Sequence, residues 1–220
     1  MNVLGFDTST AASTACLLRD DGEAFEAGPP AGSPQTAPRH AGELLPRIVE
    51  CLDRAGLGFR DVDIVAVGRG PGAFTGLRIG FATARALGQA HSIPVRTVPT
   101  LQALAAGMSA PLALPLIDAR RGEVFGALYE STEQRWDDFA ASPEALVSRL
   151  RESGLRPLAA GDGSLRFREL LETAGVRVAP GSSPSHLVRA LNICRLAARD
   201  QPATPITPLY LREPDARPSR

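Results

Sequence analysis

The stretch from Gly70 to Gly80, with the sequence GPGAFTGLRIG, constrains the fold more than any other part of this chain. It opens on a glycine-proline turn and continues directly into a pattern typical of a helix. The apolar run from Ile64 to Gly68, just before it, is typical of a buried strand. We therefore expect a strand, a glycine loop and a helix that begins near Gly76, which together indicate an α/β protein.

A glycine loop at the start of a helix serves one of two purposes. It can bind an anion, because the first helical N–H groups lack partners and carry partial positive charge, and Thr75 is placed to cap this end. It can also be a tight structural turn, which is the more frequent case. No lysine follows the glycines as in a Walker A loop, and the GxGxxG spacing of a dinucleotide fold is absent. Both alternatives stay open.

Composition excludes several classes of protein. All 24 basic residues are arginines, 24 acidic residues balance them, and no segment forms a basic stripe, so autonomous binding to nucleic acid is not expected. Hydrophobic residues make up 44% of the chain, but no apolar run approaches the roughly 18 residues of a membrane span. The opening MNVLGFD lacks the basic region of a signal peptide. We expect a globular cytoplasmic protein without membrane contact.

The spacing of cysteine and histidine argues against a disulfide framework or a metal site. Three cysteines are isolated from one another, and we expect each to be a small buried hydrophobic residue: Cys16, Cys51 and Cys194. A metal-binding HxxxH pair needs two imidazoles one helical turn apart. The histidines of this chain lie far apart in the sequence: His40, His91 and His186.

The first half of the chain has strand patterns followed by alternating helix and strand patterns. The sequence Asp20-Asp21-Gly22 predicts a hairpin turn between the second and third strands. Residues 28–38, almost all Gly, Pro, Ala, Ser, Gln and Thr, predict a mobile surface loop. The expected strands cover 2–6, 14–18, 24–27, 64–68 and 94–98, and the expected helices cover 40–55, about 76–91 and 100–107, the last capped by Thr100.

The second half repeats the same order of elements without a detectable sequence repeat. We expect strands at 112–117, 123–129, 157–160 and 176–178, a turn at 161–163, and helices at 142–153, 165–174 and 185–198. The prediction is therefore a duplicated α/β fold with domains at 1–108 and 109–200. A proline-rich tail at 201–220 should be extended, and Leu209-Tyr210-Leu211 is the part expected to dock.

Two helices carry the argument about function. In the helix 40–55 the apolar residues form one arc and the charged residues another. In the helix ending near 91 apolar residues cover almost the whole circumference, and such a helix must be buried on almost every side. Either the rest of the chain covers it or a partner does. We expect a subunit interface that includes Leu44, Ile48, Leu52, Leu77, Gly80, Phe81, Thr83, Ala84 and Leu87.

Several segments together resemble the bacterial TsaB (YeaZ) family. They are FDTST at 6–10, RHAGELLP at 39–46, GRGPGAFTGLRIG at 68–80, DARRGEVF at 118–125 and PLYLR at 208–212. The resemblance runs over most of the chain, and the glycine-rich segment is highly specific. Ala41 and Ala73 stand where the family usually has serine, and the loop at 28–38 is longer and richer in proline than is usual.

This resemblance implies both a fold and a role. The fold would be two ribonuclease-H-like halves of the actin and sugar-kinase (ASKHA) superfamily, each a mixed sheet flanked by helices. The role would be that of a non-catalytic subunit of the machinery that places a threonylcarbamoyl group on N6 of adenosine 37 in tRNAs reading ANN codons. It would pair with the catalytic paralogue TsaD through the helices near 40 and 76. The ATPase TsaE would bind the pair, tRNA would be contacted only through the complex, and the chain alone would form a homodimer.

For catalysis and cofactors, the expectation is mostly negative. We expect no catalytic residue, no metal ion and no bound cofactor, while ATP or ADP at the partner interface stays open. The candidates for residual nucleotide binding lie in the first loop and in the glycine loop: Asp7, Thr8, Gly70, Gly72 and Thr75.

Two other functions remain open. One is an autonomous nucleotide-dependent kinase or ATPase, with Asp7 in the first phosphate loop and Asp118 and Asp162 as counterparts in the second half. The loop after Asp7 lacks the glycine that such enzymes use. The other is a protease-like chaperone, for which Ser9 and Ser13 have no histidine nearby in the sequence.

Overall fold

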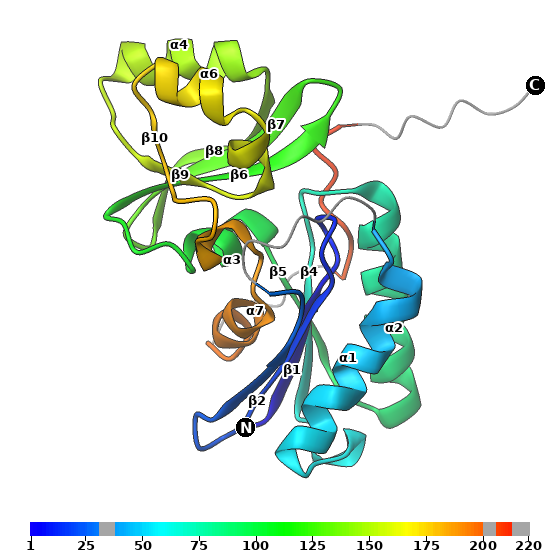
Figure 1. Ribbon diagram of the computed structural model, residues 1–220. Coiled ribbons are helices and arrows are strands. Elements are labelled where there is room, and N and C mark those ends of the chain that lie inside the picture. The colour runs from blue at the N-terminus through cyan, green and yellow to red at the C-terminus, as the bar shows by residue number, and fades with distance from the viewer. Residues whose placement is uncertain (31–37, 200–205, 213–220) are drawn as a thin grey trace, which may run out of the picture.

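The chain forms two lobes, and each is built on a mixed sheet (Figure 1). The computed structural model describes residues 1–30, 38–199 and 206–212, so most of the predicted mobile loop at 28–38 lies outside the described residues. The first half of the chain forms β1 (Val3–Asp7), β2 (Thr14–Leu18), β3 (Ala24–Ala27), α1 (His40–Ala55), the short 3-10 helix η1 (Phe59–Asp61), β4 (Ile64–Gly68), α2 (Phe74–His91), β5 (Val95–Val98) and α3 (Thr100–Ala105).

The first sheet has the strand order β3-β2-β1-β4-β5. Strands β1, β2 and β3 pair antiparallel, and a tight turn with Gly22 at φ 89° joins β2 to β3, as predicted. Strands β1, β4 and β5 pair parallel, because the connections through α1 and α2 return the chain to the same end of the sheet. Both helices cover the same face (Figure 1).

Successive side chains of β1 point to opposite faces of the first sheet, so this strand contributes to the hydrophobic clusters on both faces. Leu4 and Phe6 point to one face and pack in a cluster with residues of α1 and α2. Val3 points to the other face, where residues of α3 and of both sheets form a second cluster. Every residue of β1 is buried, because the strand is covered on both faces.

The second half of the chain repeats the topology of the first. Its sheet has the order β10-β9-β6-β7-β8, with β6, β7 and β8 antiparallel and β6, β9 and β10 parallel. The duplicated fold predicted from element order is confirmed. The elements are β6 (Leu112–Arg120), β7 (Glu123–Glu130), β8 (Glu133–Ala141), α4 (Pro143–Ser153), β9 (Leu158–Ala160), α5 (Asp162–Arg166), α6 (Arg168–Thr173), β10 (Arg177–Val178), the 3-10 helix η2 (Pro184–His186) and α7 (Ala190–Ala197).

The sequence reading missed one strand and misplaced helix ends in this half. Strand β8 is an edge strand with the mostly polar sequence EQRWDDFAA, so it lacks the apolar alternation that marks a half-buried strand. The helix expected at 165–174 is two short helices that meet at Phe167. The helix expected from 185 begins only at Ala190, after η2.

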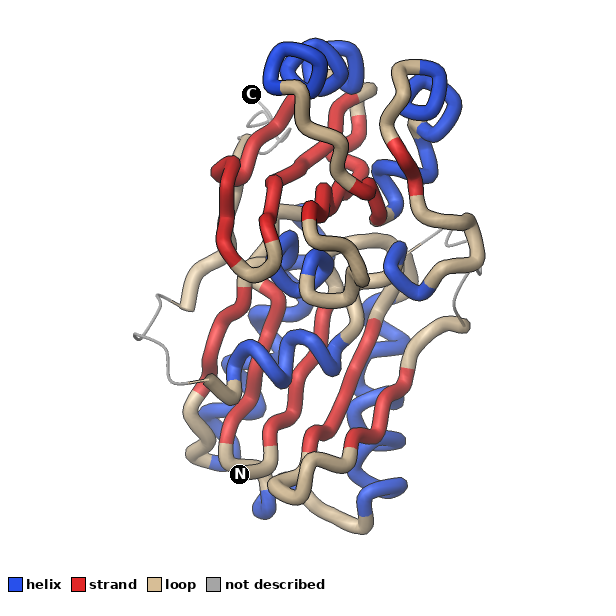
Figure 2. The backbone as a smooth tube through the Cα atoms, turned by 90° about the vertical axis from the view of Figure 1, so that its left-hand side faces the viewer, coloured by secondary structure: helices blue, strands red, loops and turns tan. Residues whose placement is uncertain are grey.

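Helix α7 returns the chain to the first lobe. It lies across the first sheet on the side opposite α1 and α2, and Figure 2 shows it crossing the lower sheet. The Asn192 side chain donates to the carbonyl of Ala103, and Arg96 donates to the carbonyl of Ala197. The apolar face of α7, which belongs to the predicted domain 109–200, thus covers the first sheet.

The segment 206–212 passes between the two lobes. The Leu209 N–H donates to the carbonyl of Arg69 at 2.7 Å, and the Tyr210 ring lies 5.2 Å from the ring of Phe74. The predicted docking of Leu209-Tyr210-Leu211 is confirmed.

Among the helices in the described residues, none is both long enough and apolar enough to cross a membrane.

Candidate functional site

The glycine loop packs directly against the loop that joins β1 to β2. A Cβ atom at Gly72 would collide with the backbone of Ser9, and one at Gly76 would collide with the carbonyl of Thr8. The Thr8 hydroxyl donates to the carbonyl of Gly76 at 2.8 Å, and the Ala73 N–H donates to the carbonyl of Ser9 at 2.7 Å. Close packing of two backbone segments therefore explains the glycines, as the structural-turn alternative predicts.

The start of α2 differs from the prediction in two ways. The helix begins at Phe74, before Gly76, and the residue that precedes it is Ala73. Thr75 is an exposed residue inside the first turn and does not cap the helix. Thr100 was predicted to cap α3 but instead its hydroxyl accepts from the Gly70 N–H at 3.0 Å. The glycine loop is thus fixed from both sides.

Asp7, a candidate for phosphate or magnesium chemistry, is enclosed by the protein. Its side chain is 1% exposed, and its Oδ1 accepts from the Ser9 N–H at 2.9 Å and from the Ser9 hydroxyl at 2.6 Å. Burial raises the pKa of Asp7 to about 6, although the bonds from Ser9 and Thr100 oppose this. The other carboxylate oxygen, Oδ2, lies 3.4 Å from the Thr100 hydroxyl.

The acidic candidates of the second lobe are held by arginine and backbone groups. Asp118 lies 2.7 Å from Arg166 and 3.3 Å from Arg120. Asp162 accepts from the Asp118 N–H at 3.0 Å, and burial raises the pKa of Asp162. Across the described ranges, no group of three or more His, Cys, Asp or Glu residues is placed to hold a metal ion.

The structure brings together a serine and a histidine that the sequence keeps apart. Ser13 Oγ lies 2.8 Å from His40 Nδ1, which corrects the expectation that Ser13 has no histidine near it. Ser13 is 0% exposed and His40 is 4% exposed. A nucleophile must reach its substrate, so this buried pair does not make a hydrolase site. It joins the β1–β2 loop to the start of α1.

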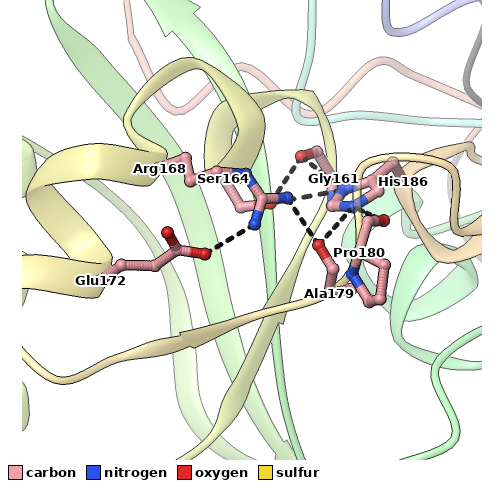
Figure 3. Close-up of polar contacts among 7 residues, drawn as sticks. All are labelled: Gly161, Ser164, Arg168, Glu172, Ala179, Pro180 and His186. Carbon is pink, nitrogen blue, oxygen red and sulfur yellow. Dashed lines mark hydrogen bonds and ion pairs between the residues drawn. The ribbon is translucent and has the colours of Figure 1, made fainter.

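A second serine–histidine contact lies in the second lobe, where Figure 3 shows its surroundings. His186 Nδ1 accepts from the Gly161 N–H at 3.1 Å, and Ser164 Oγ lies 3.4 Å from the same nitrogen. His186 Nε2 therefore carries the proton and donates to the carbonyls of Ala179 and Pro180. The ring holds the segment after β10 against the start of α5, so its role is structural.

Most residues predicted to contact a partner lie in the core of the protein itself. The inner arc of α1 and the inner face of α2 are needed to cover the apolar side chains of β1 and β4, so they cannot also face a partner. Seven of the predicted residues are buried in the chain itself: Leu44, Ile48, Leu52, Leu77, Gly80, Phe81 and Ala84. Thr83 and Leu87 are half-buried.

The outer faces of the same helices carry the exposed apolar residues. On α1, Leu45 is 50% exposed and Val49 is 45% exposed. On α2, Ala82, Ala86 and Ala90 are exposed and follow one another at helical spacing. Leu45 and Val49 belong to the apolar arc of the predicted helix 40–55. That arc is wider than one helix face, which is the signal in the sequence that part of it is exposed.

The duplicated topology and the interlobe packing define the class of protein. Hexokinase of the ROK group from Thermus thermophilus superposes with a TM-score of 0.50 at 15% identity, covering 90% of this chain and 100% of that one. This likeness concerns the fold alone. The protein has the two-lobed actin and sugar-kinase (ASKHA) fold.

Closer relatives define the family. Residues 33–164 match the family model described as TsaD: tRNA N6-adenosine threonylcarbamoyltransferase. The tRNA threonylcarbamoyladenosine biosynthesis protein TsaB of Escherichia coli is 30% identical over 82% of this chain and 80% of its own length. An uncharacterized protein of Mycobacterium tuberculosis is 36% identical over 98% of this chain and 94% of its own length. A Pseudomonas aeruginosa structure, described as similar to peptidase YEAZ, superposes with a TM-score of 0.76 at 31% identity over 96% of this chain and 99% of that one. The chain belongs to the TsaB (YeaZ) family.

Proposed function

We propose that this protein is a non-catalytic subunit in the biosynthesis of threonylcarbamoyladenosine in tRNA, and that it pairs with the catalytic subunit TsaD. Family membership supports the role in this pathway. The match to the TsaD model over residues 33–164 supports descent from a common two-lobed ancestor, and paralogues of one fold present related helices to each other.

The main support for the proposed pairing is the exposed apolar face of α1 and α2. This face is defined by Leu45, Val49, Ala82, Ala86 and Ala90. Large apolar side chains on a solvent-facing helix favour burial against another protein. Small alanines on the neighbouring helix allow the backbone of a partner helix to approach closely. We place the partner on this outer face, away from the first sheet.

Our proposal that the protein has no reaction centre of its own is supported by the contacts of its acidic candidate residues. Asp7 is enclosed by Ser9 and Thr100, and Asp118 is engaged by Arg120 and Arg166. A kinase of this fold needs carboxylates that are free to hold magnesium at the interlobe cleft. These contacts support a scaffold more than an autonomous phosphotransferase.

Further features of the assembly follow from the family relationship and are part of the same proposal. TsaE joins the pair as its ATPase, tRNA is contacted only through the complex, and the complex works in the cytoplasm. Without TsaD, the exposed face of α1 and α2 pairs with a second copy of this chain.

Reconstitution tests this proposal. Purified TsaD, TsaE, tRNA and threonylcarbamoyl-adenylate are combined with and without this chain, and modified adenosine is measured by mass spectrometry. We expect modification to depend on the chain, and equal modification without it would contradict the proposal. The chain alone is also assayed for ATP hydrolysis, where turnover above the buffer background would favour the kinase alternative.

A further inference from the structure

The segment 206–212 lies along helix α2. The Arg85 guanidinium donates to the carbonyl of Ile206 at 2.8 Å, and the Tyr210 ring lies 5.2 Å from the Phe74 ring. Phe74 and Arg85 point to the same side of α2 and are about three helical turns apart. The segment therefore follows the helix over this length and is fixed to it at two separate points.

Helix α1 lies on the other side of α2. Gly76 comes two residues after Phe74 and so points to the opposite side of the helix, where it faces His40 of α1. The exposed alanines of α2 point between these two directions. Helix α2 thus forms the middle of a surface that has α1 on one side and the segment 206–212 on the other.

The segment adds exposed apolar side chains to this surface. Ile206 is 37% exposed and Tyr210 is 41% exposed. In the part of the chain that the structure describes, few large apolar side chains are this exposed, and Leu45 and Val49 of α1 are two others. Single exposed apolar residues are ordinary, but apolar residues on three adjoining elements form a patch that favours burial against another protein. The surface available for pairing is therefore wider than the face of α1 and α2 alone.

Helix α2 carries two arginines and no acidic residue. Both arginines are exposed: the Arg78 guanidinium lies 3.9 Å from the centre of the Phe74 ring, and Arg85 is the residue bonded to the segment. Among the described residues, neither guanidinium forms an ion pair with a carboxylate. On α1, by contrast, each arginine is paired with a glutamate one turn earlier. The α2 side of the surface therefore has positive charge that the described residues do not neutralise.

Arginine and tyrosine, together with tryptophan, are the side chains that most often dominate the binding energy of protein interfaces. A guanidinium without a carboxylate of its own forms a charge-assisted hydrogen bond when a partner supplies one. We propose that TsaD contacts the segment 206–212 in addition to α1 and α2, and that the part of TsaD lying on Arg78 and Arg85 carries acidic side chains among apolar ones. This inference rests on the proposed function and adds to it the chemistry of the partner surface.

The first experiment tests whether the segment belongs to the interface. The affinity of purified TsaD for the full chain is measured by calorimetry for the wild type, Ile206→Glu and Leu165→Glu. Leu165 is a matched control, because it is 38% exposed against 37% for Ile206 and lies in the second lobe. We expect Ile206→Glu to weaken binding about tenfold or more, because it places a negative charge opposite acidic side chains, and Leu165→Glu to leave binding unchanged.

The second experiment tests the charge of the partner surface. Arg149→Glu is the control for Arg78→Glu, because Arg149 is exposed on α4 and its guanidinium also lies 3.9 Å from the centre of an aromatic ring, that of Trp136. We expect Arg78→Glu to weaken binding about tenfold or more, Arg78→Lys to stay within about threefold of the wild type, and Arg149→Glu to have no effect. Raising the NaCl concentration should weaken binding of the wild type more than that of Arg78→Glu, because salt screens an attraction that this variant has lost.

Val49→Glu on α1 separates this inference from the pairing itself. Weakened binding by Val49→Glu, with full affinity in folded Ile206→Glu or folded Arg78→Glu, would overturn the inference and leave the pairing standing. No binding by the wild type would contradict the pairing and this inference with it. Self-association of the chain that Arg78→Glu abolishes, with the affinity for TsaD intact, would assign the surface to a second copy and also overturn the inference.

Discussion

The guanidinium of Arg212 lies 2.7 Å from the carboxylate of Glu123, and this ion pair ties the segment 206–212 to the second lobe. Arg212 also donates to the carbonyl of Ala119 at 2.9 Å, while Leu209 is bound to Arg69 of the first lobe. The segment is therefore bonded to both lobes and bridges the boundary between them.

Arg212→Gln should lower the free energy of unfolding by about 1 kcal/mol, because both the ion pair and the bond to Ala119 are lost. Glu123→Gln should cost about 0.5 kcal/mol or less, because the pair is partly exposed. Urea unfolding of both single variants and of the double variant measures these costs. An Arg212→Gln protein as stable as the wild type would show that the bridge contributes nothing.

The buried carboxyl of Asp7 gives stability a pH dependence of predictable sign. Burial raises the pKa of Asp7 from 3.8 to about 6, so the folded state binds the proton more tightly than the unfolded state. The resulting stabilisation is complete below about pH 4 and is lost as the pH rises through about 6. Other buried acids, including Asp162, act in the same direction.

The difference in stability between the wild type and Asp7→Asn isolates the contribution of this residue to the pH dependence. Asparagine keeps an acceptor for Ser9 and carries no charge, so the variant should gain stability relative to the wild type as the pH rises from 4 to 7. The gain has an upper limit of about 3 kcal/mol. Thermal unfolding at several pH values measures it, and a constant difference across this range would contradict the assignment.

Ala84 and Ala86 on α2 form a matched pair for separating core from surface. Ala84 is 0% exposed against the first sheet, whereas Ala86 is exposed. Ala84→Arg should unfold the chain, because it puts a bulky unpaired charge into a packed core at a cost above about 4 kcal/mol. Ala86→Arg should change stability by less than about 0.5 kcal/mol. Thermal unfolding followed by circular dichroism distinguishes the two, and similar losses in both variants would mean that Ala86 is also core.

Gly76 and Gly42 test whether the glycine loop is built for close packing. A side chain at Gly76 would collide with the Thr8 carbonyl, but one at Gly42 would meet nothing within 4 Å. Gly76→Ala should destabilise the protein by about 2 kcal/mol or more. Gly42→Ala should stabilise it by up to about 1 kcal/mol, because alanine favours the helix. Chemical denaturation compares the two, and a harmless Gly76→Ala would mean that the loop tolerates movement.

Local sequence patterns predicted most of the first lobe, because its strands and helices have strong and distinct periodicities. The helix from His40 to Ala55 has the predicted bounds, and β1 and β4 lie within a residue of theirs. Strand β8 was not predictable in this way, because an exposed edge strand is stabilised by pairing with β7 and carries little pattern of its own.

The candidate site was less predictable, because it depends on contacts between distant segments. Ser13 and His40 are 27 residues apart and meet only when α1 packs beside the β1–β2 loop. The apolar arc of α1 was visible in the sequence, but the sheet decides which part of the arc is core and leaves Leu45 and Val49 outside. Asp7 was visible as a candidate, but its enclosure by Ser9 and Thr100 was not.

The affinity of this chain for purified TsaD tests the pairing most directly, measured by calorimetry with Val49→Glu and with Leu165→Glu as the matched control. Both residues are exposed, at 45% and 38%, but Val49 lies on the outer face of α1 and Leu165 lies in the second lobe. We predict that Val49→Glu weakens binding about tenfold or more and that Leu165→Glu leaves it unchanged. Undiminished binding by folded Val49→Glu, or no binding by the wild type, would contradict the account.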